Sequence, residues 1–182
     1  MHSFKCITIF FRNPYDRLLS AYQDKALRDG GQYTKRALRT KHNYNTGPLP
    51  FPAFIKAILD GARHGEKDLS SPTAGSNLDG HWAPQVLLCD PCRTNYTMVG
   101  FHQHMAADLM ASLTEFRMDV AISKQNSNDE VLSENITRIP RSQWYKQLDE
   151  ESIKGIQELY QEDFKILGLN SEPPLDEDWN ES

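Results

Sequence analysis

The stretch FKCITIFFRNPYDRLLSAYQDKALR, residues 4–28, decides the fold that we predict for this chain. Its first part, residues 6–11, carries no charge and is rich in β-branched and aromatic side chains. Such a run favours a strand that is buried on both faces, as in a parallel sheet. The apolar run stops at Arg12, where polar residues and a proline begin.

A helix is predicted directly after this strand. Asn13 is a good N-cap, and Pro14 suits the first helical position. Asp16 would lie in the first turn, where a carboxylate suits the helix dipole. Apolar residues then recur at helical spacing at positions 18, 19, 22 and 26. A buried strand that runs into a capped helix indicates an α/β fold.

The junction between this strand and this helix is a candidate anion site. Ligands of α/β sheets bind at the carboxyl ends of the strands, and backbone N–H groups at a helix start favour an anion. The guanidinium of Arg12 can hold a phosphate through two parallel hydrogen bonds, and the hydroxyl of Ser20 can add a third. The spacing also fits an alternative without a ligand, in which Arg12 pairs with a carboxylate and Ser20 is a small packing residue.

Residues 12–25, RNPYDRLLSAYQDK, resemble the 3′-phosphate-binding segment of the Golgi carbohydrate sulfotransferases. The resemblance is to the HNK-1 and chondroitin/dermatan 4-O-sulfotransferase group. Two further stretches agree with the family in the same order. HWAPQ at 81–85 leads into CDPC at 89–92 and YTMVG at 96–100, and LYQEDFKILG follows at 159–168. The three matches together cover most of the chain.

The resemblance implies a P-loop-like α/β fold with a mostly parallel central sheet flanked by helices. We expect a single domain over residues 1–170 and an acidic tail at 171–182. The implied activity is carbohydrate O-sulfotransfer from 3′-phosphoadenosine-5′-phosphosulfate, without a metal. In the family's motif, the 3′-phosphate of this donor is held by the positions that are Arg12 and Ser20 here. The acceptor would be a hydroxyl of a glycan such as chondroitin or dermatan, and we expect no nucleic-acid partner.

The resemblance also implies a place in the Golgi lumen. Relatives are usually anchored in the Golgi membrane, whereas this sequence has no apolar stretch near 18 residues. Sequons at Asn95, Asn135 and Asn180 favour a secretory compartment and a glycoprotein. In an oxidising lumen Cys89 and Cys92 could close a small disulfide loop. The alternative, a zinc site, lacks a second cysteine pair at suitable spacing.

His81 is the candidate catalytic base. Sulfuryl transfer needs a base that takes the proton of the acceptor hydroxyl as this attacks sulfur, and a histidine with a pKa near the working pH suits that role. The alternative is a histidine that is hydrogen-bonded in the wall of the fold, with Trp82 beside it as a core residue. His102 and His104 carry less weight as candidates.

Charge is distributed unevenly along the 182 residues, whose net charge is −5. Residues 1–42 hold nine Lys and Arg against three Asp and Glu. A basic N-terminal part fits a polyanionic donor and an acidic sugar polymer, although residues 35–41 also fit a solvated loop. Arg138 and Arg141 lie where sulfotransferases often have a late basic loop, but a surface role is the simpler interpretation.

Three further helices are predicted from apolar spacing. The first covers residues 51–62. The second covers about 104–116, with an inner stripe at positions 105, 109, 113 and 116. The third begins after Asp149 as its N-cap and ends at Gly168.

A sulfotransferase also needs a second site that binds the 5′-phosphosulfate of the donor. In the family this site is a strand–loop–helix unit that lies upstream of the 3′-phosphate segment. The chain starts five residues before the predicted strand, and no G-x-x-x-x-G-K-[ST] motif replaces that loop. We expect an exposed sheet edge beside residues 6–11, where the missing strand would pair. Two alternatives therefore stay open: the catalytic portion of an enzyme, or an inactive fragment or glycan-binding module. A kinase-like P-loop enzyme is disfavoured because the Walker lysine is absent.

Overall fold

A computed structural model describes residues 7–28, 49–64, 78–116 and 139–176 of the chain. In these ranges strand β1 (Thr8–Phe11) pairs in parallel with β2 (Met98–Phe101), with Thr8 opposite Met98 and Phe11 opposite Phe101. A Cβ added at Gly100 would lie 2.6 Å from Cε1 of Phe10, so only glycine fits beneath this ring. The parallel pairing and the α/β class are as predicted.

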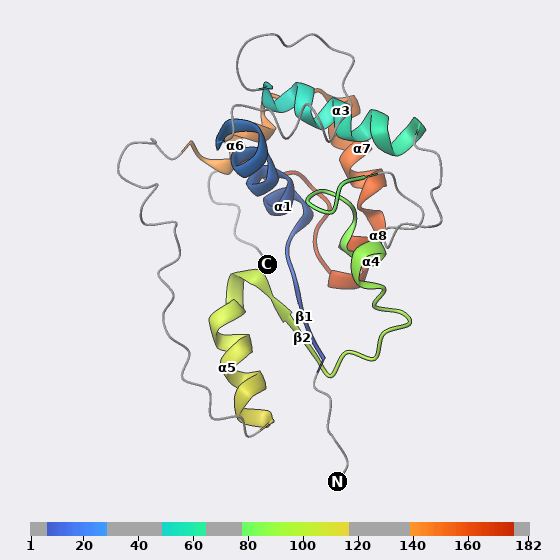
Figure 1. Ribbon diagram of the computed structural model, residues 1–182. Coiled ribbons are helices and arrows are strands. Elements are labelled where there is room, and N and C mark those ends of the chain that lie inside the picture. The colour runs from blue at the N-terminus through green and yellow to red at the C-terminus, as the bar shows by residue number, and fades with distance from the viewer. Residues whose placement is uncertain (1–6, 29–48, 65–77, 117–138, 177–182) are drawn as a thin grey trace.

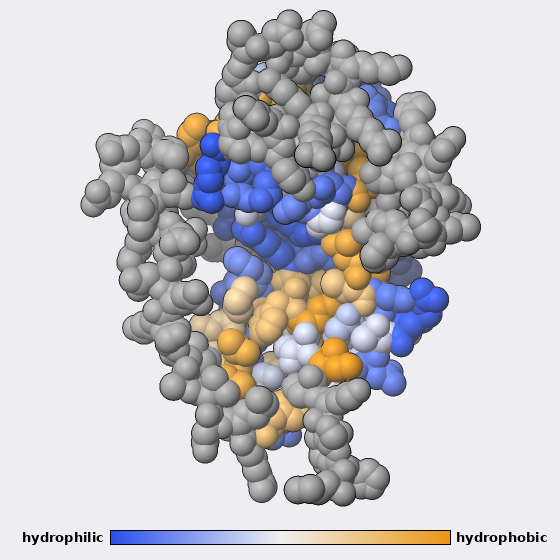
Figure 2. Space-filling view, in the orientation of Figure 1, coloured by the Kyte–Doolittle hydropathy of each residue, from blue (hydrophilic) through white to orange (hydrophobic). Residues whose placement is uncertain are grey.

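Burial of β1 differs from the prediction. Ile9 and Phe11 are buried, but Thr8 and Phe10 are only partly buried, so the strand has one covered face and one partly open face. Apolar side chains are also exposed nearby, with Val99 at 52% and Ile7 at 41% exposure. Figure 2 shows apolar side chains gathered in the region that β1, β2 and α5 (Met105–Glu115) occupy in Figure 1.

The helix after β1 begins as the sequence predicts. α1 (Pro14–Ala21) has Asn13 as its N-cap, and the Asn13 side chain accepts a hydrogen bond of 2.9 Å from the Tyr15 N–H. The chain then continues as a wider π-helical segment, η1 (Tyr22–Arg28). The apolar residues at positions 18, 19, 22 and 26 are all buried, as their spacing indicates.

The core lies where α1 and η1 pack with helices from later in the chain. These are α3 (Phe51–His64), α6 (Arg141–Tyr145), α7 (Glu150–Leu159) and α8 (Gln161–Leu167). Figure 1 shows α3 lying beside α7 above the strands. A Cβ added at Gly155 of α7 would lie 2.6 Å from Cδ1 of Leu59, so the two helices meet closely there. The largest fully buried side chains are Trp82, Tyr15, Tyr145, Tyr160, Phe51, Phe54, Leu18, Leu49, Ile55, Ile58 and Ile156.

Helix α5 (Met105–Glu115) follows β2 through the short 3₁₀ turn η2 (His102–His104) and lies apart from this core (Figure 1). Its predicted inner stripe is not buried core: Met105 is 39% exposed, and the remaining stripe residues are half-buried. Periodicity predicts an apolar face but does not predict what covers it. Asp108 fixes the helix to the sheet by accepting a 2.7 Å hydrogen bond from the Phe101 N–H.

The last predicted helix is two helices. Asp149 is the N-cap of α7, and the left-handed Gly168 (φ 63°) ends α8, both as predicted. The break falls at Tyr160, whose hydroxyl donates to the buried carbonyl of Trp82. At the start of the expected tail, the Ser171 carbonyl accepts a 2.6 Å hydrogen bond from Tyr15 Oη. In the described ranges, no helix is both long enough and apolar enough to cross a membrane.

Replacing Tyr160 tests the bond that joins α7 to residues 78–84. In Tyr160→Phe the buried carbonyl of Trp82 loses its donor, and we expect a loss of about 1–3 kcal/mol in the free energy of unfolding. Urea unfolding measures this loss. Tyr96→Phe is the matched control, because the Tyr96 hydroxyl donates to the partly buried Cys89 carbonyl, which water can reach. An equal loss in both variants would contradict this account.

Asp149 makes stability depend on pH. A hydrogen bond from Lys56, followed by those from Ser152, lowers the pKa of Asp149. Because the pKa is lower in the folded state, the stabilisation is present above the unfolded pKa of about 4 and is lost as the pH falls below it. We expect the melting temperature of Asp149→Asn, which keeps an N-cap but not the charge, to fall less steeply with acid than that of the wild type. Parallel curves would contradict the role of the charge.

Candidate functional site

The predicted anion site lies where β1 ends and α1 begins. Arg12 follows the last residue of β1 and is half-buried, and Ser20 is half-buried near the end of α1. About seven residues of helix separate them, or about 10 Å along the axis at 1.5 Å per residue. The long side chain of Arg12 must span this separation if both residues are to contact one phosphate.

The start of α1 is already occupied by protein groups. Asn13 caps it, and the largely buried carboxylate of Asp16 lies in its first turn. Arg141 pairs with Asp16 at 2.7 Å, so this arginine of the late basic segment contacts α1. Arg138 lies outside the described residues. The positive end of the helix dipole therefore faces the carboxylate of Asp16.

The backbone of Arg12 is held by one buried side chain. The Arg12 N–H donates to Oε1 of Gln85 at 2.9 Å, and Nε2 of Gln85 donates to the Arg12 carbonyl at 2.6 Å. Gln85 is the first residue of α4 (Gln85–Cys89) and is 6% exposed. A single amide thus satisfies both backbone groups of the candidate phosphate ligand.

Gln85 is held in turn by Asp163 of α8. The Asp163 carboxylate accepts hydrogen bonds from the Gln85 N–H at 2.8 Å and the Val86 N–H at 2.9 Å. Burial raises the pKa of Asp163, and these hydrogen bonds and the nearby Arg17 oppose that effect. Because Pro84 gives α4 no side-chain cap, Asp163 serves as its N-cap from a distant part of the sequence.

Arg17 fixes the segment that carries the candidate base. Its guanidinium donates to the carbonyl of Ala83 and, at 2.7 Å, to that of Gly80. Burial lowers the pKa of Arg17, the nearby Tyr160, Asp163 and Cys89 raise it, and the charge of Arg12, which has the smallest of these effects, lowers it. The two guanidinium groups therefore lie within electrostatic range of each other near the end of β1, where two positive charges favour an anion.

His81 lies on the exposed part of this segment. Its Nδ1 is 2.5 Å from Oδ1 of Asp79, which also accepts the His81 N–H at 2.9 Å. A hydrogen bond from Lys25 lowers the pKa of Asp24, and His81 adds to this effect. The imidazole therefore lies within electrostatic range of η1, next to the helix that carries Ser20.

Other candidates from the sequence lie elsewhere. His102 and His104 are exposed on η2 beside the strands. Cys89 and Cys92, for which the sequence left a disulfide loop open as a possibility, are both free thiols in this structure. Cys89 ends α4 half-buried, whereas Cys92 is exposed beyond the left-handed turn at Asp90 (φ 46°), so the two sulfur atoms lie in different environments. Among the described residues no three His, Cys, Asp or Glu side chains come together as a metal site.

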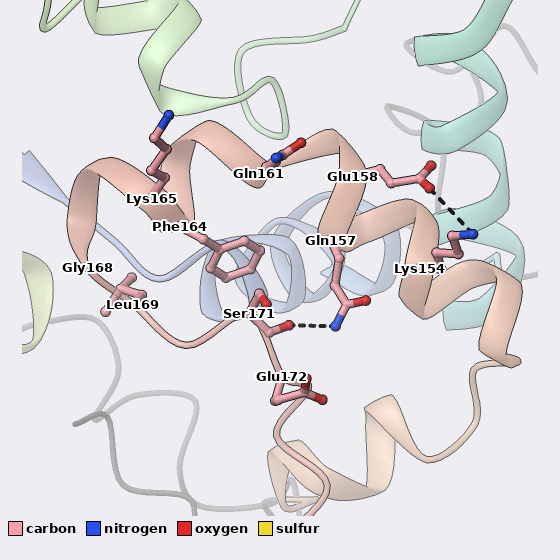
Figure 3. Close-up of a pocket in the computed structure, with 10 residues that line it drawn as sticks. All are labelled: Lys154, Gln157, Glu158, Gln161, Phe164, Lys165, Gly168, Leu169, Ser171 and Glu172. Carbon is pink, nitrogen blue, oxygen red and sulfur yellow. Dashed lines mark hydrogen bonds and ion pairs between the residues drawn. The ribbon is translucent and has the colours of Figure 1, made fainter.

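An open groove of about 610 Å³ lies away from these candidates. Figure 3 shows it between α7, α8 and the segment around Ser171, with Gln157 donating to the Ser171 carbonyl at 3.0 Å. Its lining is Lys154, Gln157, Glu158, Gln161, Phe164, Lys165, Gly168, Leu169, Ser171 and Glu172. None of the predicted site residues borders this groove.

Sequence reasoning missed Gln85, Asp163 and the burial of Arg17. All three residues lie in the stretches that resemble the family, and this resemblance was the signal in the sequence that could have pointed to them. However, their partners lie 63 to 78 residues away, and no local pattern identifies such pairs.

Comparison with known proteins gives a consistent result. The profile of the sulfotransferase family matches residues 2–170 of the chain. Carbohydrate sulfotransferase 14 of Mus musculus is 30% identical over 115 residues, which are 59% of this chain and 27% of the mouse protein. Carbohydrate sulfotransferase 10 of Xenopus laevis is 24% identical over 167 residues, which are 86% of this chain and 45% of the frog protein.

The chain spans less than half the length of these relatives. No solved structure shows a significant match. The family profile nonetheless covers almost the whole chain and confirms the resemblance seen in the three motifs. On this evidence the chain belongs to the sulfotransferase family.

Proposed function

We propose that this chain binds 3′-phosphoadenosine-5′-phosphosulfate and supports transfer of its sulfuryl group to a hydroxyl of a carbohydrate. Family membership supports the reaction class, and the relatives named carbohydrate sulfotransferases support a carbohydrate acceptor. The observation that carries the donor assignment is Arg12, a half-buried guanidinium at the carboxyl end of β1, with Arg17 close by. We assign the 3′-phosphate to Arg12 and Ser20.

The proposed reaction is an in-line displacement. The acceptor oxygen forms a bond to sulfur while the bond between sulfur and the 5′-phosphate oxygen breaks, and adenosine 3′,5′-bisphosphate leaves. The acceptor hydroxyl loses its proton to a base, which we propose to be His81. A hydrogen bond donated by Nδ1–H of His81 to Oδ1 of Asp79 would orient the imidazole and fix the tautomer in which Nε2 is the basic nitrogen.

The proposal also covers the acceptor carbohydrate and the cellular location. A chondroitin or dermatan chain fits the positive potential at the end of β1, because such polymers are acidic. From the motif resemblance we propose a place in the Golgi lumen, where relatives are usually membrane-anchored, and a proteoglycan or glycoprotein as the product.

Arg12→Ala tests the donor site. Loss of a charge-assisted hydrogen bond should weaken binding of adenosine 3′,5′-bisphosphate by about 1.5–3 kcal/mol, roughly 10- to 150-fold in Kd. Isothermal titration calorimetry measures this change. Arg93→Ala is the matched control, because Arg93 is an exposed arginine paired with Asp90 in the turn after α4. Unchanged affinity in Arg12→Ala would exclude Arg12 as a phosphate ligand.

His81→Gln tests the proposed base. General base catalysis contributes about 10²–10⁴-fold, so kcat for transfer of labelled sulfate to a chondroitin acceptor should fall by that factor in the full-length protein. Binding of adenosine 3′,5′-bisphosphate should not change. His102→Gln, which removes an exposed histidine on η2, is the control. If both variants keep wild-type turnover, another group takes the proton.

A further inference from the structure

A chain of hydrogen bonds runs from α8 to the candidate phosphate ligand. It passes from the Asp163 carboxylate to the N–H groups at the start of α4, and from the side chain of Gln85 to the backbone of Arg12. Asp163 is 1% exposed and Gln85 is 6% exposed, so water does not compete readily for these bonds. Such bonds hold their groups in place more firmly than exposed ones.

Gln85 continues the hydrogen bonding of the sheet beyond its last paired residue. The register of β1 and β2 ends with Phe11 opposite Phe101, and Arg12 is the next residue along β1. Gln85 then accepts from the Arg12 N–H and donates to the Arg12 carbonyl, as a neighbouring strand residue would. The backbone from which the Arg12 side chain extends is therefore fixed at the point where the chain leaves the sheet.

An amide is the only common side chain of this length that can both accept a hydrogen bond from the Arg12 N–H and donate one to the Arg12 carbonyl. Glutamate could accept from the Arg12 N–H, but its carboxylate has no proton to donate and would lie against the Arg12 carbonyl oxygen. Asp163 sets the position of this amide, because it holds both N–H groups at the start of the five-residue α4. Asp163 therefore affects the position of Arg12 through its hydrogen bond to Gln85.

We propose that Gln85 and Asp163 are positioning residues that fix Arg12 for the 3′-phosphate of the donor. This inference rests on the proposed function. It predicts that loss of the Gln85 amide weakens recognition of the 3′-phosphate while leaving binding of the rest of the nucleotide unchanged. A role limited to stability would affect every ligand of the folded protein equally.

The test compares two nucleotides that differ by one phosphate. Affinities of adenosine 3′,5′-bisphosphate and adenosine 5′-monophosphate are measured by calorimetry for the wild type, Gln85→Ala and Gln85→Glu. We expect both variants to bind the bisphosphate about 10- to 100-fold more weakly, as a displaced ligand side chain does, and the monophosphate as the wild type does. Hydrogen exchange of the Arg12 amide should be faster in Gln85→Ala.

Gln157→Ala is the matched control, since Gln157 also donates its side-chain amide to a backbone carbonyl, that of Ser171. It should leave both affinities unchanged. Gln85→Glu keeps the side-chain volume and serves if Gln85→Ala does not fold. If Arg12→Ala loses the bisphosphate while Gln85→Glu binds it as the wild type does, the positioning role is refuted and the proposed function stands. If the wild type does not prefer the bisphosphate, the proposed function fails and this inference fails with it.

Discussion

Residues 82–85 are buried without forming a strand, and a buried backbone must find hydrogen-bond partners for its polar groups. Side chains from other elements supply these partners. Arg17 of α1 donates to the Ala83 carbonyl, and Tyr160 donates to the Trp82 carbonyl. Asp163 accepts from the Gln85 N–H. This requirement joins the N-terminal helix, the middle of the chain and the C-terminal helices into one unit.

Because buried backbone groups need hydrogen-bond partners, Arg12 and Arg17 have different roles. Arg17 uses its guanidinium inside the protein, where backbone carbonyls replace the water that it loses. Arg12 contacts Gln85 through its backbone at the end of β1, and the residue is half-buried. Both arginines are partly exposed, but the guanidinium of Arg17 is committed to the carbonyls of Ala83 and Gly80, which makes Arg17 a structural residue of this segment.

Sequence reasoning predicted the features that depend on neighbouring residues. Asn13 caps α1, Asp149 caps α7 and Gly168 ends α8, because each signal acts within one helical turn. The break at Tyr160 was not predicted, since apolar spacing continues through it, and the residue there bonds through its hydroxyl to a residue 78 positions away. In the same way, the spacing of Cys89 and Cys92 did not show that they occupy different environments.

The stretches that carried the family resemblance contain residues of two physical kinds. Gln85, Tyr160 and Asp163 meet the needs of a buried backbone, and a protein with this fold requires them whether or not it binds a nucleotide. Arg12 and Ser20 are the positions that the family motif assigns to the 3′-phosphate of the donor. A match at the first kind is therefore evidence for the fold, whereas direct contact with the 3′-phosphate is proposed for Arg12 and Ser20, and Gln85 and Asp163 would act on that contact only through the backbone of Arg12. This difference is why ligand affinity at Arg12, rather than the stability of the domain, decides between an enzyme and a protein that retains only the fold.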